Sequence, residues 1–501
     1  MKKSFRQALS DSSFPIGVEI VTTRGIPQPS VSLPNLAKEL LTDKRINYVS
    51  ITDNPGGNPM LPPDWLARQL ADFAPNLFLH LACKDYNRAG LESQLWRYAA
   101  DGFENILALT GDLPTEGYPT VSGGVFDIDS VSLLAMMKAM NGGLPNLNRK
   151  RQIEPLPPTN FYAGAAVNPF KSKENELIPQ YAKLLKKIAA GAQWIIPQLG
   201  YDMRKFADVQ TFLAQNHASV PLIGNVYVLT KTAATKFNRN KLAGCVVADS
   251  LMQQIEKYAG GADKGKQFFK ELATKQIAVF RGLGFAGVYL GGLDKPEAIF
   301  EIIDKAKSYA TDDWKEFYTE IQYNKPDEFY YVQPDSTDSK KRSRNFFNVS
   351  LFYRFSRLVH AIAFHRGHGL YSLIKRFYEF LDRPEPIRRC TAEVLHQIEY
   401  SSKFFLYSCS DCGDCGLPDA AYLCPMNRCS KNQRNGPCGG SHNGRCEADD
   451  KDCLWTIVYD RLQHFDEWEE FVLGLPICYN AGLRGTSAWA NLYLDRDHSA
   501  E

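Results

Sequence analysis

The stretch LFLHLACKDYNRAGLESQLWRYAADGFENILALTG, residues 77–111, decides the fold of this chain. Two mainly apolar runs, 77–82 and 106–111, flank a segment, 91–100, whose apolar side chains recur at helical spacing. Gly102 follows that segment at the position where a left-handed helix cap is favoured. A strand, a helix and a second strand in this order predict one βα unit of a parallel sheet.

The same alternation continues on both sides of this stretch, from residue 17 to residue 292. Segments 176–190 and 267–283 are amphipathic, and each is followed by a glycine. Strand starts recur roughly every thirty residues, which is the length of a βα unit. The predicted strands are 17–21, 46–52, 77–82, 106–111, 161–167, 192–199, 221–228 and 285–292.

Eight βα units predict a (β/α)8 or TIM barrel, a fold of the α/β class, over residues 1–310. An open doubly wound sheet fits less well, because such sheets have about six strands and a glycine-rich first turn. No G-x-G-x-x-G motif follows the first predicted strand. In a barrel, the reactive residues lie at the carboxyl ends of the strands and in the loops that follow.

The alternation stops where the barrel is expected to end. A polar segment with turn-forming residues and a basic run, 323–344, predicts a linker over residues 311–345. Residues 346–501 are then expected to form a smaller domain of helices and loops that binds metal through its cysteines.

Cysteines are concentrated near the end of the chain, because ten of the twelve follow residue 389. In a reducing compartment such clustering favours metal ligation over disulfide bonds. The predicted metal ligands are Cys409, Cys412, Cys415, Cys424, Cys429, Cys438, Cys446 and Cys453.

The spacing of these cysteines indicates the kind of metal site. The first three form a C-x2-C-x2-C run and Cys424 precedes a proline, as in ferredoxin-type iron–sulfur loops. Eight residues separate Cys415 from Cys424, however, where the bacterial ferredoxin run has about three. Eight thiolates also suffice for two tetrahedral zinc sites. We therefore expect one or two [4Fe-4S] clusters, with Zn²⁺ as the alternative.

The composition limits the partners of the chain. The 58 basic and 56 acidic side chains give a formal net charge of +2, so we do not expect nucleic acid as a partner. We expect a small-molecule partner instead. Lys2 and Lys3 precede no apolar segment of signal-peptide length, and no run approaches 18 apolar residues. We expect a cytoplasmic protein without a membrane span, and a homo-oligomer remains open.

Polar side chains stand at the ends of several predicted strands. Glu19 lies between two aliphatic residues, where a carboxylate is costly to bury unless it has a function or a partner. Shielding from water would raise its pKa, which suits a general acid near neutral pH. Asp112 directly follows Gly111, whose small size would let a planar ligand approach the backbone. His80 and Gln198 end two further strands, and such convergence predicts an active site.

Several motifs resemble the methylenetetrahydrofolate reductase family, a group of flavin-dependent (β/α)8 barrels, over roughly residues 14–310. From about residue 327 to GTSAWANLYLDRDH (485–498), the chain is similar to the cysteine-rich C-terminal domain fused to or associated with such reductases in bacteria with acetogen-like one-carbon pathways. The barrel motifs are SITDNPGGNP (50–59), HLACKDYNR (80–88), ILALTGDLP (106–114), GVFDIDSV (124–131) and KKIAAGAQWIIPQL (186–199).

The resemblance implies an oxidoreductase acting on CH–NH donors, which reduces 5,10-methylenetetrahydrofolate to 5-methyltetrahydrofolate with a hydride from reduced flavin. It implies that Glu19 is the general acid and that Asp112 stabilises the cationic substrate between flavin and pterin. The implied flavin-binding residues are Thr52, His80, Thr110, Gly111, Asp112, Ala166 and Lys187. The implied folate-binding residues are Glu19, Asp112, Gln198 and Phe237, the last by stacking.

Some positions depart from the family pattern. The first strand reads VEIVTT (18–23) without the usual prolines, and Gln180 and Ala233 replace an aspartate and a glutamine. Thr110 stands where an arginine often contacts the dinucleotide, so FMN is an alternative to FAD. The electron donor is therefore open between ferredoxin or another carrier, acting through iron–sulfur clusters, and NAD(P)H. Two alternatives remain: a structural zinc module with NAD(P)H or the reverse reaction, and a pterin-binding methyltransferase barrel without flavin.

Overall fold

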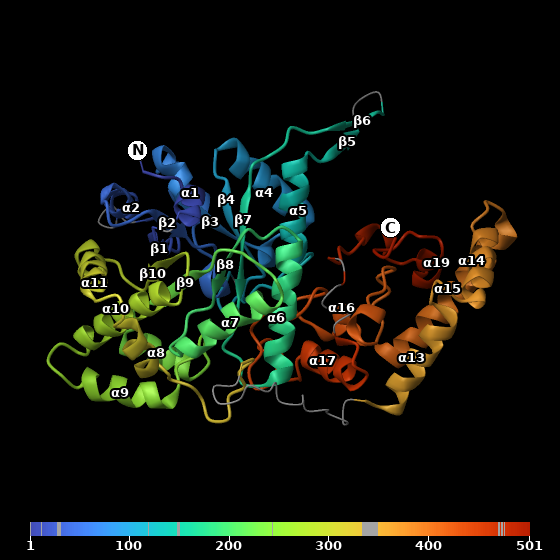
Figure 1. Ribbon diagram of the computed structural model, residues 1–501. Helices are drawn as coiled ribbons and strands as arrows, with labels where there is room; N and C mark the ends of the chain where they lie inside the picture. The colour runs from blue at the N-terminus through green and yellow to red at the C-terminus, as the bar shows by residue number, and fades with distance from the viewer. Residues whose placement is uncertain are drawn as a thin grey trace.

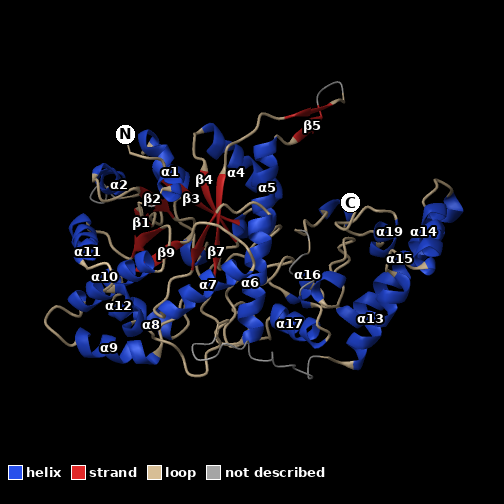
Figure 2. Ribbon diagram, in the orientation of Figure 1, coloured by secondary structure: helices blue, strands red, loops and turns tan. Residues whose placement is uncertain are grey.

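Eight parallel strands form the barrel that the sequence predicts (Figures 1 and 2). The computed structural model describes residues 2–500 except 12, 28–31, 119, 148–150, 243, 333–348, 469–470, 472–473 and 475. Neighbouring strands pair in the order β8-β7-β4-β3-β2-β1-β10-β9. A parallel bridge between Ile195 and Leu222 joins the two ends of this order, so the barrel closes. The strands are β1 (Ile16–Ile20), β2 (Tyr48–Ile51), β3 (Leu77–Ala82), β4 (Asn105–Leu109), β7 (Tyr162–Val167), β8 (Trp194–Pro197), β9 (Ile223–Tyr227) and β10 (Gly287–Gly291).

Helices surround the barrel and bury the outward aliphatic side chains of the strands in one core. They start where the sequence supplies caps: the side chains of Asn87, Asp129 and Asp202 accept hydrogen bonds from the first turns of α4, α5 and α7. The helices are α2 (Leu33–Thr42), α3 (Pro63–Arg68), α4 (Arg88–Ala100), α5 (Ser130–Gly142), α6 (Glu174–Ala189), α7 (Met203–Gln215), α8 (Lys231–Asn238), α9 (Asp249–Ala259), α10 (Lys266–Gly282) and α11 (Pro296–Ser308). Short 3-10 turns are η1 (Pro55–Gly57), η2 (Ala71–Asn76) and η3 (Cys83–Asp85).

A short helix that the sequence did not predict, α1 (Phe5–Ser10), closes the amino-terminal end of the barrel. Phe5 is fully buried, and its ring lies 4.8 Å from that of Tyr48, 5.3 Å from Phe78 and 5.1 Å from Trp194. These rings fill the half of the barrel at the amino ends of the strands, so the open half lies at the carboxyl ends of the strands.

We expect Phe5→Ala to lower the free energy of unfolding by about 3 to 5 kcal/mol, because it leaves a cavity among these rings. Chemical denaturation measures this loss. Phe405→Ala is the matched control, since Phe405 is 83% exposed, and it should change stability by less than about 0.5 kcal/mol. Equal stabilities of the two variants would contradict the packing described.

Two features lie outside the predicted pattern. A hairpin of β5 (Pro145–Leu147) and β6 (Ile153–Pro155) extends from the barrel between α5 and β7 (Figure 1). Helix α12 (Trp314–Glu320) occurs within the stretch expected to be a linker, and Trp314 packs against Gly282 of α10, where a Cβ would lie 2.1 Å from its ring. The part of the expected linker from 333 to 345 lies outside the described residues.

The C-terminal domain consists of helices at its periphery and cysteine-bearing loops between them. It packs against the barrel through α6, where Ile178 and Ala182 share an apolar cluster with Tyr459 and Trp468. In the described part of the chain, no helix is long and apolar enough to cross a bilayer. The helices are α13 (Leu351–Ala363), α14 (Gly369–Leu381), α15 (Pro386–Tyr407), α16 (Pro425–Arg428), α17 (Leu454–His464) and α19 (Ala488–Tyr493), with 3-10 turns η5 (Pro418–Ala420) and η6 (Ala481–Leu483).

Candidate active site

The carboxyl ends of the strands meet at one mouth of the barrel, as expected for this fold. The parallel register sets Glu19 of β1 beside Ser50 of β2, and His80 of β3 beside Leu107 of β4. The structure places the predicted strand-end residues in or directly after these strands. They are Glu19, Thr52, His80, Thr110, Gly111, Asp112, Ala166 and Gln198.

Glu19 is an isolated carboxyl group near the mouth. It has no hydrogen bond or ion pair to any described residue, and its side chain remains partly accessible. Gly291 of β10 leaves room for it, because a Cβ there would lie 3.0 Å from Oε1 of Glu19. Desolvation raises the pKa of Glu19 to about 7. The group can therefore hold or release a proton near neutral pH, as a general acid must.

His80 lies on β3, and Thr52 directly follows β2, the strand next to β1 with Glu19. Nε2 of His80 lies 2.9 Å from Oγ of Ser50, and the imidazole stacks on Phe78 with the ring centroids 5.7 Å apart. Burial lowers the pKa of His80 to about 3, so the ring is neutral at pH 7. The hydroxyl of Thr52 is buried without a hydrogen-bond partner among the described residues. An orphaned buried hydroxyl is uncommon and marks a place where a ligand would supply the partner.

The C-terminal domain contributes a lysine to this mouth. Nζ of Lys431 donates a hydrogen bond of 2.9 Å to the carbonyl of Gly111, and it lies 3.7 Å from Oδ1 of Asp112. The same ammonium lies 2.5 Å from Oε1 of Glu447. Desolvation raises the pKa of Asp112 and Lys431 opposes this rise, although the Asp112 side chain is still 41% exposed. Asp112 is thus an accessible acid beside a cation from the second domain.

A segment of the C-terminal domain, residues 431–441, covers the ends of β4 and β7. The amide oxygen of Gln433 accepts from the hydroxyl of Thr110 at 3.4 Å and from Nζ of Lys183 at 2.8 Å. Nζ of Lys183 also lies 3.1 Å from Oδ2 of Asp129. Nζ of Lys171 donates to the carbonyl of Gly439 at 2.6 Å. We call residues 431–441 the covering segment.

The other residues implied by the resemblance lie around the same mouth. Lys187 reaches from α6, and its Nζ donates to the carbonyl of Ala166 at 2.6 Å. Burial lowers the pKa of Lys187 to about 7. Phe237 of α8 is buried, and its ring meets that of Tyr227 edge-on at 5.5 Å. The amide oxygen of Gln198 accepts from the backbone N–H of Leu199 at 2.9 Å.

A cavity of about 390 Å³ lies between the barrel mouth and the C-terminal domain. Its walls combine Asp112, Lys171 and Cys245 of the barrel with His442 and Glu447 of the C-terminal domain. The volume is in the range of a small-molecule site. The second domain therefore forms part of the wall of the candidate active site.

All twelve cysteines are free thiols, and electrostatic interactions divide the eight predicted ligands into two sets. We call Cys409, Cys412, Cys415 and Cys424 the outer set, and Cys429, Cys438, Cys446 and Cys453 the inner set. The inner set adjoins the barrel mouth, because Cys438 donates to Glu447 at 3.4 Å and interacts with Lys431. Its Sγ also accepts the backbone N–H of Gly440 at 3.4 Å, as metal-bound thiolates commonly do.

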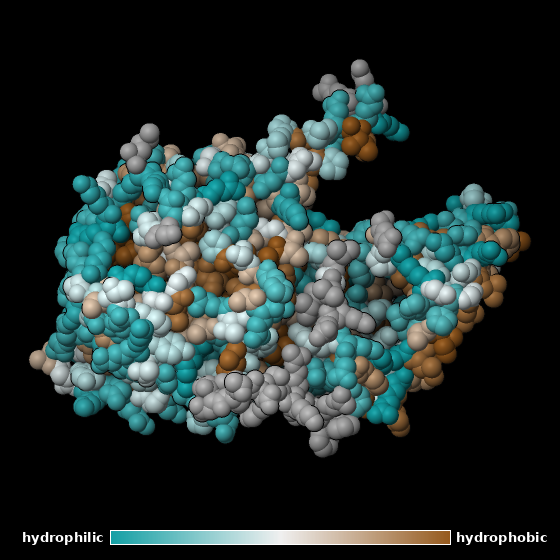
Figure 3. Space-filling model, viewed as in Figure 1, coloured by the Kyte–Doolittle hydropathy of each residue, from teal (hydrophilic) through white to brown (hydrophobic). Residues whose placement is uncertain are grey.

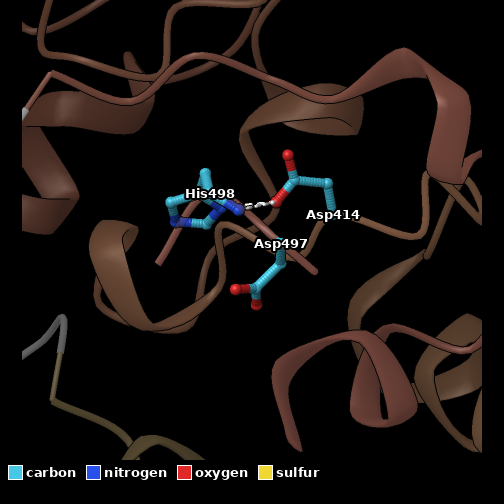
Figure 4. A group of neighbouring side chains, drawn as sticks. All are labelled: Asp414, Asp497 and His498. Atoms are coloured by element: carbon cyan, nitrogen blue, oxygen red, sulfur yellow. Dashed lines mark hydrogen bonds and ion pairs between the residues drawn. The ribbon is translucent and has the colours of Figure 1, made fainter. Parts of the chain in front are cut away.

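The C-terminal tail fixes the loop of the outer set (Figure 4). His498 pairs through Nδ1 with Asp414 and through Nε2 with Asp419 at 3.1 Å. Burial lowers the pKa of His498, but the two carboxylates outweigh this effect and raise it to about 10. Asp414 also accepts the backbone N–H of Asn480 at 2.7 Å. Asp497 accepts hydrogen bonds from Ser499, so the group of Asp414, Asp497 and His498 is internally paired and ties the C-terminal tail to Asp414, which stands between Cys412 and Cys415.

Both parts of the chain match known families. Residues 5–307 match methylenetetrahydrofolate reductase, and residues 389–476 match a domain described as methylene-tetrahydrofolate reductase C terminal. The chain belongs to the methylenetetrahydrofolate reductase family. This result confirms the resemblance and the barrel fold inferred from the sequence.

Relatives of the chain include two yeast members of the reductase family. Methylenetetrahydrofolate reductase 2 of Schizosaccharomyces pombe is 26% identical over 247 residues, covering 46% of this chain and 35% of its own. Methylenetetrahydrofolate reductase 2 of Saccharomyces cerevisiae is 27% identical over 196 residues, covering 37% and 29%. The match therefore spans about a third of the length of these relatives.

The chain is also similar to a solved structure, that of an uncharacterized protein from Clostridium thermocellum that binds two copies of 5-methyl-5,6,7,8-tetrahydrofolic acid. It aligns with 60% of this chain and 97% of its own at 13% identity, with a TM-score of 0.43.

Sequence reasoning missed Lys431, Gln433 and Glu447 as residues of the mouth. They stand between or beside predicted cysteine ligands, in a stretch without helical or strand periodicity. The only local signal is a lysine close to Cys429, and it does not indicate that the covering segment reaches Gly111. Local motifs cannot predict a contact between residues that are more than 300 positions apart in the chain.

Proposed function

We propose that this chain interconverts 5,10-methylenetetrahydrofolate and 5-methyltetrahydrofolate with a flavin bound at the barrel mouth, and that [4Fe-4S] clusters in the C-terminal domain pass electrons to that flavin. Family membership supports the reaction class. The observation that carries the proposal is Glu19, a carboxyl group at the first strand end that pairs with no described residue and has its pKa raised to about 7. A barrel used only as a scaffold has no need of such a group.

The residues at the mouth are suited to a flavin. The orphaned hydroxyl of Thr52 and the neutral His80 offer hydrogen-bonding groups. When bound, the flavin would supply the hydride, which amino-acid side chains cannot. The hydroxyl of Thr110 already bonds to Gln433 at the position where a family arginine often contacts the dinucleotide. This contact favours FMN over FAD.

The side chains of the mouth would act on the substrate. Glu19 would donate its proton to a ring nitrogen of methylenetetrahydrofolate, which helps the five-membered ring to open to an iminium ion. Asp112 would bind the folate and stabilise the positive charge as it develops. Gln198 and Phe237 would orient the pterin, the latter by stacking.

The inner and outer sets are suited to iron–sulfur clusters. The outer set opens with a C-x2-C-x2-C run and ends with Cys424 before a proline, as in ferredoxin-type loops. This spacing supports [4Fe-4S] clusters over zinc, and such clusters would supply single electrons.

Anaerobic purification with metal and flavin analysis tests the proposal. We expect flavin and about eight iron atoms per chain. Zinc without iron would replace the electron-transfer role with a structural module that uses NAD(P)H or runs the reverse reaction. A colourless protein that binds methyltetrahydrofolate would indicate a methyltransferase barrel instead.

Lys431 should matter for folate binding more than for flavin binding. In Lys431→Met, Asp112 loses its cation and faces Glu447, so we expect the KM for methylenetetrahydrofolate to rise by about tenfold. Steady-state kinetics and the flavin content of the purified protein measure the two effects. Lys451→Met is the control, because that lysine pairs with Asp449 at the surface. An unchanged KM would show that Lys431 does not contribute to folate binding.

A further inference from the structure

The two helices at the far end of the C-terminal domain carry apolar side chains that none of the residues described by the structure covers. On α13, Leu351, Phe355, Leu358 and Ile362 follow the spacing of one helix face and are 85%, 59%, 57% and 49% exposed. On α14, Leu370, Leu373, Phe377 and Phe380 do the same at 42%, 65%, 46% and 48%. We call these eight side chains the outer apolar face.

The outer apolar face does not belong to the apolar clusters that the described residues form in this domain. Both helices bury other sides: Tyr371, Tyr378 and Leu381 of α14 pack against Tyr493, and Tyr353 of α13 packs in the cluster around Trp455. Figure 3 shows hydrophobic side chains gathered along the outer edge of the molecule, where Figure 1 places α13 and α14. Soluble monomers rarely expose large apolar side chains gathered in this way, so the face indicates a binding surface.

An apolar cavity connects this face with the outer set of cysteines. The cavity has a volume of about 300 Å³, and Phe355 of the outer apolar face lines it together with Val359, Leu406 and Trp489. Cys415, a member of the outer set, also lines the cavity. A protein bound on α13 would therefore lie close to the outer set.

The charge around the face selects the kind of partner. From residue 350 to residue 407 the chain has nine Lys and Arg residues against five Asp and Glu residues. Arg354, Arg376 and Arg389 are exposed and form no ion pair with any described residue. Two copies of this surface would repel each other, whereas an acidic protein would be attracted and correctly oriented.

We propose that the outer apolar face is the docking surface for an acidic, ferredoxin-type iron–sulfur protein, which delivers electrons to the outer set. This inference rests on the proposed function of the two cysteine sets. Each reduced partner molecule would lose one electron, so two encounters supply the pair that reduces one folate, and solvent supplies the protons. The apolar centre would give affinity, and the flanking arginines would give orientation and rate.

Binding of the full-length, anaerobically purified protein to a two-cluster bacterial ferredoxin tests the inference by calorimetry. We expect Leu358→Glu/Leu373→Glu to weaken binding by at least about tenfold, because the change puts a charge on each helix of the face at an exposed leucine. Ile153→Glu is the matched control, since Ile153 is 73% exposed on the distant hairpin, and it should bind normally. Added salt should weaken binding of the unmodified protein.

Three outcomes would overturn the inference. The first is that the double variant binds ferredoxin as tightly as the unmodified protein does. The second is that the unmodified protein has twice the mass of 56.4 kDa in solution and the double variant is monomeric, which would show that a second copy covers the face. The third is that the unmodified protein binds anionic lipid vesicles and not ferredoxin. Iron content and flavin reduction by dithionite, measured on the same samples, show separately whether the proposed function fails.

Discussion

Glu19→Gln is expected to lower the rate of folate turnover by about a hundredfold or more while the flavin stays bound. Glutamine keeps the size of the side chain and its fit beside Gly291, but it cannot donate the proton that opens the substrate ring. Stopped-flow measurement of flavin reoxidation by methylenetetrahydrofolate isolates this step. Glu39→Gln is the matched control, because Glu39 is exposed on α2, and its rate should not change.

The pH dependence provides a second test of the same residue. Because the pKa of Glu19 is raised to about 7, the acid form predominates below pH 7 and is lost above it. The kcat/KM for methylenetetrahydrofolate should therefore fall by about tenfold per pH unit above pH 7, and this decline should be absent from Glu19→Gln. Unchanged turnover in the variant would remove Glu19 from the mechanism.

Cys412→Ser is expected to abolish electron entry from a protein donor and to lower the iron content by up to about four atoms per chain. A serine oxygen is a poor ligand for a site built from thiolates. Reduction of the flavin by dithionite should persist, because the inner set and the barrel mouth are untouched. Iron analysis and donor-dependent flavin reduction measure the two effects.

Cys390→Ser is the matched control for this variant, since Cys390 is an exposed thiol outside both sets. It should keep its iron and its electron entry. If Cys412→Ser instead unfolds the domain and releases zinc, the outer set is a structural site and not an electron-transfer site.

The barrel could be predicted because each βα unit is specified locally. Apolar runs, amphipathic segments and glycine caps lie within about thirty residues of one another, and all eight predicted strands occur. Their ends shift by one or two residues; the strand predicted at 106–111 ends at Leu109, because Gly111 adopts a left-handed conformation with φ of 88°. Helix α1, which carries Phe5, has no such sequence signal, since a six-residue helix is too short to show periodicity.

The positions of the candidate site residues on the barrel strands were predictable for the same reason. The contribution of the C-terminal domain was not. Glu19, His80 and Asp112 follow from the rule that strand ends converge. Lys431 does not, because its place beside Asp112 depends on how the two domains pack. The division of the cysteines into two sets likewise depends on loop geometry, which ligand spacing alone leaves undetermined.

The most direct measurement is a single turnover of the anaerobically purified protein. The flavin is first reduced, methylenetetrahydrofolate is then added without any other donor, and flavin absorbance and methyltetrahydrofolate are followed together. The account predicts that the flavin reoxidises in step with the formation of an equal amount of methyltetrahydrofolate. A protein without flavin, or a reduced flavin that does not respond to the folate, would contradict it.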